Sequence, residues 1–312
     1  MPTSRPPQPP RAGAPRERTE ALRAKAEALR ALHHADRPLV LANVWDAASA
    51  RLFESVGYRA IATSSAGVAY AWGYPDGELI GRRQMLEAVR RIAAAVSVPV
   101  TADLEAGYGA DAKAVSKTVR DLVAAGAVGF NLEDARGGTL LGLPEQAARV
   151  RAARATAGRL GVPVVINART DVFHGVEPSP SHLAGAVARG NAYLDAGADA
   201  VFVPFVRDAE TIGALTRGIR GPVNILLVPG APSVAELWAL GVRRVSVGSG
   251  LARAAYGVAR RAALELRERG TADLVEQWGV SYDEMQRLLS VANPATAKKA
   301  SGAAGGGRGH KL

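Results

Sequence analysis

The stretch from Lys113 to Asp134, KAVSKTVRDLVAAGAVGFNLED, contains in order a helix, a turn, a strand and two acids. Its first part, 113–125, has apolar residues at helical spacing, and Gly126 follows at the point where a helix would end. The run from Val128 to Glu133 is apolar and β-favouring, as expected for a parallel strand that is covered on both faces. The stretch therefore predicts one helix–strand unit of an α/β fold, with Glu133 at the carboxyl end of its strand.

This unit recurs along the chain. Seven further β-favouring runs are Leu39–Asn43, Ala60–Thr63, Val98–Asp103, Val162–Arg169, Ala200–Pro204, Pro222–Leu227 and Arg243–Val247. Segments with helical spacing lie between the runs, at 81–96, 145–157, 181–196 and 209–217. Eight such units favour a closed (β/α)₈ barrel of the TIM type, but periodicity does not reveal closure. An open doubly wound sheet therefore stays an alternative.

The two ends of the chain differ in composition from the part between them. Residues 1–16 are rich in proline and arginine and residues 295–312 in glycine and lysine, so both are predicted to be disordered tails. Residues 17–294 are predicted to form one barrel domain. Within it, 16–32 is expected to cover the N-terminal end of the barrel, and 251–269 with 272–292 to add helices beyond the eighth unit. Surplus C-terminal helix of this kind often packs on a neighbouring subunit.

Composition excludes several classes of protein. The 312 residues include no cysteine, so disulfides, thiolate metal sites and cysteine nucleophiles are absent, and any metal needs oxygen or imidazole ligands. We expect a cytoplasmic protein with no membrane segment, because no apolar run approaches about 18 residues. The net charge is +10, but residues 1–30 and 295–312 carry +4 each. The residues between these two ends therefore carry nearly equal numbers of positive and negative charges, which argues against a groove that binds nucleic acid.

Acidic residues follow three of the predicted strands. Asp103 and Glu105 lie two residues apart at the end of the third run, Glu133 ends the fourth, and Asp76 lies in the loop after the second. Because the carboxyl ends of barrel strands share one mouth, these four acids are expected to meet there. Any one of them could instead cap a helix or pair with an arginine. As a set they repel each other unless a cation neutralises them, and oxygen ligands alone suit Mg²⁺ or Mn²⁺.

Two further sites lie at strand ends. Arg169 ends the fifth run, where its guanidinium could be the salt-bridge partner of the acids or a two-pronged donor to a substrate carboxylate. Both interpretations stay open. Ser64 and Ser65 follow the second run and would offer hydroxyls and backbone N–H groups to an anion.

The order of these motifs resembles the isocitrate lyase/phosphoenolpyruvate mutase superfamily from about Leu39 to Gly250. The carriers of the resemblance are Ala102-Asp103-Leu104-Glu105-Ala106-Gly107-Tyr108-Gly109, Asn131-Leu132-Glu133-Asp134 and the segment 64–76. The resemblance implies that Asp103 binds Mg²⁺ directly and that Glu105, Glu133 and Asp76 bind it through water. It further implies that Trp45 with Asp46, Ser64, Ser65 and Arg169 contact a 2-oxo acid substrate, and that the chain forms a homotetramer.

Departures from the superfamily pattern narrow the expected reaction. The cysteine-containing loop of isocitrate and methylisocitrate lyases is missing. The loop after the fourth strand offers a phosphonate only Arg136 and Thr139, and Val203-Pro204-Phe205 stands where the mutase has a histidine. What remains is the stabilisation of a 2-oxo acid enolate by Mg²⁺ and positive charge. The sequence therefore predicts a carbon–carbon lyase or decarboxylase acting on a small 2-hydroxy or 2-oxo dicarboxylate, with Asp76, Glu133 and Arg169 as catalytic residues.

Three alternatives stay open beside this interpretation. The first is phosphonomutase chemistry at a phosphorus–carbon bond, and the second is a barrel that binds an oxo acid without catalysis. The third is a phosphate-binding barrel, for which the glycine-rich run 247–250 gives slight support. The proton donor is also undecided between His174 and Tyr108.

Overall fold

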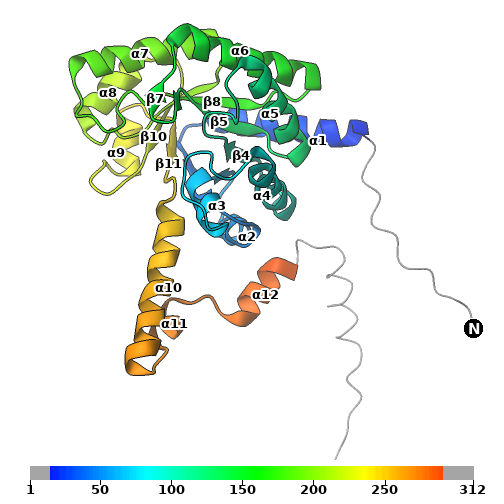
Figure 1. Cartoon of the computed structure of the whole chain (residues 1–312), viewed down its shortest axis with the longest axis vertical. Coiled ribbons are helices and arrows are strands. Elements are labelled where there is room, and N and C mark those ends of the chain that lie inside the picture. Colours follow the sequence, from blue (N-terminus) through cyan, green and yellow to red (C-terminus); the bar gives the residue numbers. More distant parts are fainter. Residues whose placement is uncertain (1–14, 291–312) are drawn as a thin grey trace, which may run out of the picture.

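The computed structural model describes residues 15–290, and its parallel sheet is surrounded by helices (Figure 1). The predicted tails at 1–16 and 295–312 lie outside the described residues, except that residues 15 and 16 begin the first helix. The sheet contains β1 (Leu39–Leu41), β2 (Asn43–Val44), β3 (Ile61–Thr63), β4 (Val100–Asp103), β5 (Gly129–Glu133), β8 (Val165–Arg169), β9 (Ala200–Val203), β10 (Val223–Leu226) and β11 (Arg244–Ser246). All eight predicted strand runs are thus strands.

The sheet closes into a barrel. Its order is β1-β11-β10-β9-β8-β5-β4-β3-β2, with every pair parallel. β1 pairs with β11 and β2 with β3, and because both belong to the continuous run from Leu39 to Val44, the two edges are joined. Asn43 holds this seam: its Oδ1 accepts the N–H groups of Val247 and Gly248, each at 2.9 Å, and its Nδ2 donates to Thr63. The barrel prediction is confirmed, and the open sheet is excluded.

The helices follow the strands in turn. They are α1 (Pro15–Leu32), α2 (Ala47–Ser55), α3 (Ser65–Ala71), α4 (Arg82–Ala95), α5 (Ala112–Ala125), α6 (Leu143–Leu160), α7 (Pro180–Asp195), α8 (Ala209–Gly218), α9 (Val234–Ala239), α10 (Gly250–Arg269), α11 (Asp273–Trp278) and α12 (Tyr282–Ser290). Local signals set their ends: Asp111 caps α5 by accepting from Ala114 N–H, and Gly126 ends it in the left-handed conformation. Among residues 15–290, no helix is both long and apolar enough to cross a membrane.

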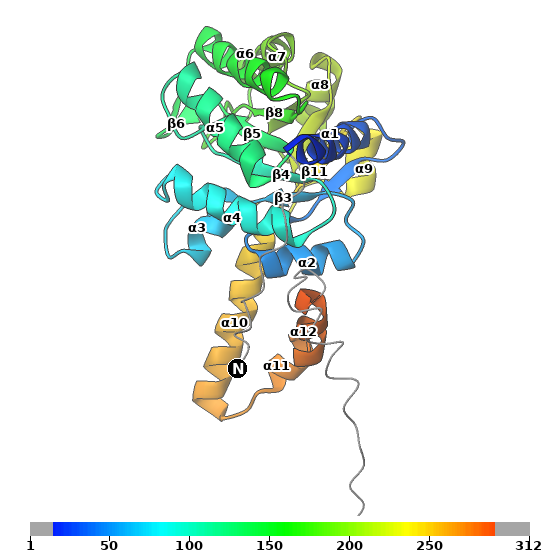
Figure 2. The ribbon, with the colours of Figure 1, turned by 90° about the vertical axis from the view of Figure 1, so that its right-hand side faces the viewer.

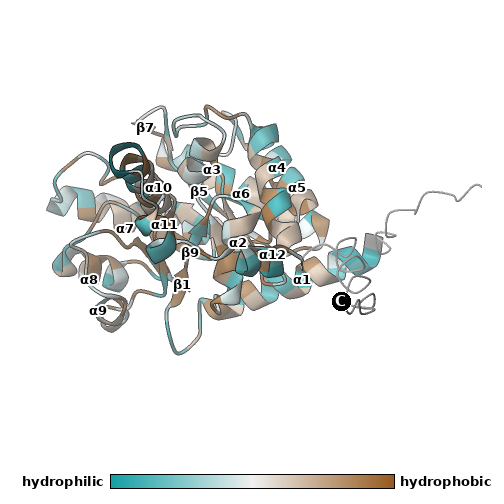
Figure 3. Ribbon diagram, turned by 90° about the horizontal axis from the view of Figure 1, so that it is seen from below, coloured by the Kyte–Doolittle hydropathy of each residue, from teal (hydrophilic) through white to brown (hydrophobic). Residues whose placement is uncertain are grey.

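The hydrophobic core lies between the strands and the helix ring. The core is formed by buried residues of the strands and of the inner faces of the helices, and Figure 3 shows hydrophilic and hydrophobic residues together on the surrounding helices. Helix α1 packs across the N-terminal end of the barrel, as expected, with Arg30 bonded to Asp199 at 2.9 Å. A Cβ on Gly129 would lie 2.8 Å from the Leu29 side chain, so glycine is needed where α1 meets β5.

The C-terminal helices leave the barrel. Figures 1 and 2 show α10 extending away from β11, with α11 and α12 folding back toward α2. The expected additional helices are present, and within 272–290 they are two, because Gly279 ends α11 in an extended conformation and α12 begins at Tyr282. Arg51 on α2 donates to the Leu288 carbonyl, which anchors α12.

Candidate active site

A cavity of about 380 Å³ lies at the carboxyl ends of the barrel strands. Its wall includes Glu133 and Arg169, which are the last residues of β5 and β8, and Asp76 and Glu105, which lie in loops that follow other strands. In a closed parallel barrel such loops converge whatever their separation in the sequence. The structure therefore brings together the acids and the arginine that the sequence singled out.

Asp103, the last residue of β4, lies at the base of this cluster. Its Oδ2 accepts the backbone N–H of Ser65 at 3.2 Å and the Ser65 hydroxyl at 2.9 Å. Its Oδ1 accepts from the Asn131 amide at 3.4 Å, and its own N–H donates to Thr63 Oγ1 at 2.9 Å. These contacts fix the orientation of the carboxylate from two neighbouring strands.

Glu105 is buried and lies in a tight loop after Asp103. Its Oε2 accepts the backbone N–H of Glu78, and its Oε1 accepts the Tyr108 hydroxyl at 3.0 Å. Glu78 in turn accepts the Tyr108 backbone N–H at 2.7 Å, so the two loops hold each other. Burial and the nearby charges of Asp103 and Asp76 raise the pKa of Glu105 to about 7.

Arg169 ends β8 and is held between two carboxylates. Its Nη1 lies 2.8 Å from Glu133 Oε2, and its Nε and Nη2 donate to Asp171 at 2.7 and 3.1 Å. Burial raises the pKa of both carboxyl groups, and the Arg169 charge opposes that rise. The salt-bridge alternative for Arg169 describes this structure, although a substrate carboxylate could still compete for the guanidinium.

Asp76 lies at the rim of the cavity, in the loop between α3 and α4. One side of it is exposed to solvent, and the other faces the cluster. Desolvation on the inner side and the charge of Asp103 raise its pKa. Three of the four predicted metal-binding acids thus have raised pKa values, first because burial desolvates them and second because neighbouring carboxylates repel them.

The donor set fits a hydrated divalent cation. The four acids offer only oxygen atoms, which suits Mg²⁺ or Mn²⁺, and a cation among them would remove their mutual repulsion. Within residues 15–290, however, no three acidic or histidine side chains converge as ready-made direct ligands. Mg²⁺ keeps several of its waters in protein sites, so one direct carboxylate with others bonded to water is compatible with this arrangement.

Backbone strain marks the same site. Outside glycine, the described residues have a positive φ at four positions only: Glu78 (59°), Glu105 (50°), Tyr108 (55°) and Phe205 (69°). Three of these line the cavity, and Tyr108 bonds to Glu105. Such strained conformations cost about 1–3 kcal/mol each and cluster at functional sites. This backbone observation supports the site without reference to its charges.

The remaining wall is formed by a hairpin and an aromatic pair. Strands β6 (Ala135–Arg136) and β7 (Thr139–Leu140) form the hairpin, whose Arg136 and two glycines line the cavity. His174 and Phe205 stack with ring centroids 4.7 Å apart at 27°. The Arg169 guanidinium lies 5.7 Å from the Phe205 ring.

A buried network supports this wall from behind. Asp134 is fully buried and accepts from Arg189 at 3.0 Å, from the Tyr193 hydroxyl at 2.7 Å and from the Asp171 backbone N–H at 2.9 Å. Arg189 also donates to the Leu141 carbonyl at 3.0 Å, at the end of the hairpin. Helix α7 thereby holds both Asp171 and the hairpin in place.

Two predicted substrate contacts lie outside the cavity wall. Ser64 is buried and caps α3 by accepting the Gly67 N–H at 3.1 Å, whereas Ser65 lines the cavity. Trp45 packs edge-on against Phe53, with centroids 6.3 Å apart, and its neighbour Asp46 caps α2. Their roles in substrate binding stay predictions.

Sequence reasoning assigned no role to three residues of the site: Glu78, Asp171 and Phe205. Asp171 had a usable signal, because it follows Arg169 at the same spacing of two that joins Asp103 to Glu105. Glu78 and Phe205 are placed by left-handed backbone conformations that the sequence does not announce.

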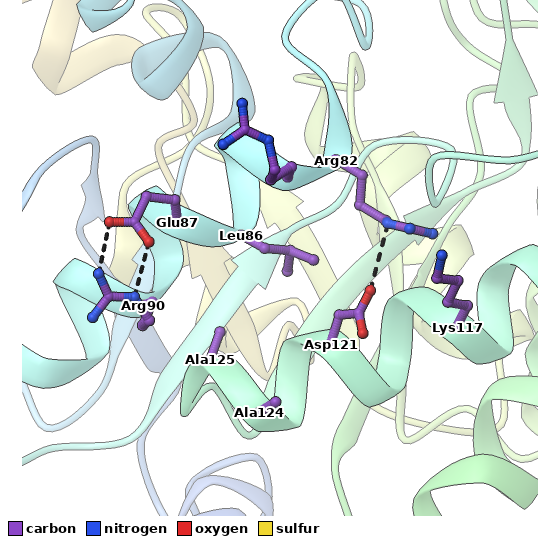
Figure 4. A pocket seen from close by; sticks show the side chains of 9 residues that line it. Arg82, Leu86, Glu87, Arg90, Lys117, Asp121, Ala124 and Ala125 are labelled. Atoms are coloured by element: carbon purple, nitrogen blue, oxygen red, sulfur yellow. Dashed lines mark hydrogen bonds and ion pairs between the residues drawn. The ribbon is translucent and has the colours of Figure 1, made fainter.

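Other hollows on the surface lack these features. The groove between α4 and α5 in Figure 4, of about 450 Å³, contains Arg82 paired with Asp121 at 3.6 Å and Arg90 paired with Glu87 at 2.7 Å. Its acids are already matched by arginines, and none of its residues is strained. The groove therefore has no group poised for chemistry.

Comparison with known proteins agrees with the geometry. A family model described as phosphoenolpyruvate phosphomutase matches residues 29–267. An uncharacterized protein of Mycobacterium tuberculosis is 37% identical over 218 residues, covering 70% of this chain and 80% of that protein. An oxaloacetate decarboxylase of Paraburkholderia xenovorans is 31% identical over 278 residues, covering 80% of this chain and 88% of that protein.

A solved structure gives the same result. A protein of Burkholderia cenocepacia assigned as a lyase/mutase is 40% identical, with a TM-score of 0.81 over 88% of this chain and 98% of that chain. The resemblance drawn from the Asp103 and Glu133 motifs is thus confirmed. The chain belongs to the phosphoenolpyruvate phosphomutase family, within the isocitrate lyase/phosphoenolpyruvate mutase superfamily, and is an enzyme of the lyase and mutase type.

Proposed function

We propose that this enzyme is a Mg²⁺-dependent carbon–carbon lyase that decarboxylates a small oxaloacetate-like 2-oxo acid, with Mn²⁺ as an alternative metal. The observation that carries the proposal is that Asp76, Glu105, Glu133 and Arg169 line one cavity, and that Asp103 bonds to Ser65 in the wall of that cavity. Similarity to an oxaloacetate decarboxylase supports this choice of reaction. In the same site, cleavage of a 2-hydroxy dicarboxylate would need the same stabilisation of negative charge.

The proposed reaction has two steps. The bond between C3 and C4 of the oxo acid breaks, carbon dioxide leaves, and the electron pair moves to the C2 carbonyl oxygen to give an enolate. A proton then adds at C3, and a shorter 2-oxo acid is released. Bound among the acids, the metal ion would supply positive charge that favours the enolate over the carbonyl form.

The side chains have distinct roles in this proposal. Asp103 would hold the metal directly, and Asp76, Glu105 and Glu133 would hold its water shell. Arg169, fixed by Glu133 and Asp171, supplies positive charge that needs no reorganisation during the reaction.

His174 is assigned the role of donating the proton that adds at C3. Tyr108 already donates its hydroxyl to Glu105, whereas the His174 ring lines the cavity and stacks on Phe205. A general acid must lie within reach of the atom that it protonates, and His174 meets that geometric condition better than Tyr108.

A homotetramer, or another homo-oligomer, is also part of the proposal. Helix α10 leaves the barrel, and the segment it begins exposes Leu266, Trp278 and Tyr282, the last to 76% of its surface. An exposed apolar surface of this kind is typical of a protein interface. Light scattering would measure the assembled mass, and a monomeric mass would contradict this part of the proposal.

The reaction is tested by assaying oxaloacetate, substituted malates and phosphonopyruvate side by side with Mg²⁺, scoring 2-oxo acid release. Oxaloacetate also decays without enzyme in the presence of metal, so Asp103→Asn at equal concentration is the control. We expect oxaloacetate-type acids to react fastest. If phosphonopyruvate is turned over far faster than every carbon acid, the enzyme is a phosphonomutase. If nothing reacts while oxalate still binds, it is a non-catalytic barrel.

A further inference from the structure

Phe205 stacks on His174 but has no role in the proposed reaction itself, yet its backbone holds a costly conformation. Phe205 has a φ of 69°, a conformation that a bulky side chain rarely adopts. Its side chain is 41% exposed, so burial in the core does not compensate for this strain. The strain instead aims the ring at the cavity, where it stacks on His174.

The charges of the cavity wall show what can lie against this pair. Five carboxylates line the cavity, those of Asp76, Glu78, Glu105, Glu133 and Asp171, against two arginines. Arg169 is already shared by Glu133 and Asp171. Only the exposed Arg136 on the hairpin is left to meet a negative group beyond the oxo-acid end of a substrate.

We propose that Phe205 determines specificity by packing against an apolar substituent on C3, so that the preferred substrate is a 3-alkyl-substituted oxaloacetate-type acid. This inference rests on the proposed function, because the oxo-acid end must lie at the Asp103 side for C3 to face the ring. Decarboxylation of such an acid gives a 2-oxo acid with a longer alkyl chain. The wall beside the substituent consists of the Phe205 and His174 rings and two hairpin glycines. An anionic substituent at C3 would instead enter a wall with an excess of carboxylates.

The test uses product-like 2-oxo acids, so that it does not depend on turnover. With Mg²⁺ present, calorimetry would measure the Kd of pyruvate, 2-oxobutyrate, 2-oxovalerate and 2-oxoglutarate. We expect affinity to rise up to about fourfold for each added methylene, the factor that corresponds to full burial of that group. 2-Oxoglutarate, with a negative end, should bind more weakly than 2-oxovalerate.

Variants distinguish the effect of the Phe205 ring on binding from a general loss of structure. Phe205→Asn tolerates the left-handed backbone but removes the apolar surface, and should abolish the dependence on chain length. Phe205→Leu should retain part of it. Trp238→Leu is the matched control, because Trp238 also stacks with an arginine, Arg243 at 4.5 Å, but lies outside the cavity wall.

The outcomes distinguish this inference from the function on which it rests. If oxalate with Mg²⁺ fails to bind the wild-type enzyme, the proposed function falls and this inference with it. If oxalate binds, the inference alone is overturned when 2-oxoglutarate binds more tightly than 2-oxovalerate. It is equally overturned when Phe205→Asn keeps the full dependence on chain length.

Discussion

Replacing Asp103 with asparagine should separate the metal site from the stability of the fold. Asparagine keeps the size of the side chain but removes one negative charge from a crowded cluster. The charge of Asp103 helps to raise the pKa of Glu105 to about 7, so its removal lowers that pKa and relieves repulsion. Weaker bonds from Ser65 would cost about 1 kcal/mol. These effects oppose each other, and the ligand-free variant should unfold near the wild-type temperature.

The effect of ligands on the two proteins should be very different. At a ligand concentration of about 100 times Kd, binding stabilises a native state by about 2.7 kcal/mol. Unfolding of roughly 280 ordered residues carries an entropy of about 0.6 kcal/mol per kelvin. Mg²⁺ with oxalate should therefore raise the Tm of the wild-type enzyme by about 5 °C and that of Asp103→Asn by less than about 1 °C.

Thermal denaturation with Mg²⁺ alone, oxalate alone and both together measures this difference. Asp111→Asn is the matched control, because Asp111 caps α5 away from the cavity and asparagine is also a good N-cap. It should show the full 5 °C shift expected of the wild type. If Asp103→Asn responds to the two ligands as the wild type does, Asp103 is not the direct metal ligand and the metal lies elsewhere.

Further predictions concern pH, the guanidinium and the proton donor. Burial lowers the pKa of His33 to about 3, below its unfolded value of 6.5, so its contribution to stability is complete above pH 6.5 and lost as pH falls. The free energy of unfolding, measured in urea, should therefore fall less steeply between pH 6.5 and 4 in His33→Gln than in the wild type. The difference should be up to about 1.4 kcal/mol per pH unit. Arg169→Met should cost about 3–5 kcal/mol in the same assay, because Glu133 and Asp171 lose their partner; an unchanged midpoint would contradict their coupling. His174→Gln should lower kcat at least 100-fold but leave oxalate affinity within about threefold, and equal kcat would exclude His174 as the proton donor.

The sequence predicted the barrel because its strands are apolar on both faces and separated by helices with clear ends. Glycines such as Gly126 mark those ends whatever the tertiary context. Closure could not be derived from periodicity, since it depends on β1 and β2 pairing with opposite edges of the sheet. The additional helix expected in 272–292 was found, but its division at Gly279 was not specified, because the composition is helical on both sides of that glycine.

The acids of the site were predictable for the same reason as the fold. Asp103 and Glu133 end strands, and strand ends in a barrel converge. Residues carried by irregular loops were not predictable. Glu78 reaches the Glu105 carboxylate only because its backbone is left-handed, and Phe205 faces the cavity for the same reason. Such conformations are imposed by the surrounding structure and leave little trace in residue type.

The barrel interior beneath the acids explains how the fold tolerates them. Arg244 on β11 is almost fully buried, and it donates to Asn131 at 3.3 Å while Asn131 reaches Asp103 at 3.4 Å. Burial lowers the pKa of Arg244 to about 9, which still leaves it charged at neutral pH, and the carboxylate of Asp103 favours that charge. One cation thus lies below Asp103, and a second, Arg169, lies beside Glu133. Because two internal cations offset part of the charge of the four acids, we expect the protein to fold before any metal binds. A divalent ion would then complete an existing charge balance, which is why we expect metal binding to be separable from folding.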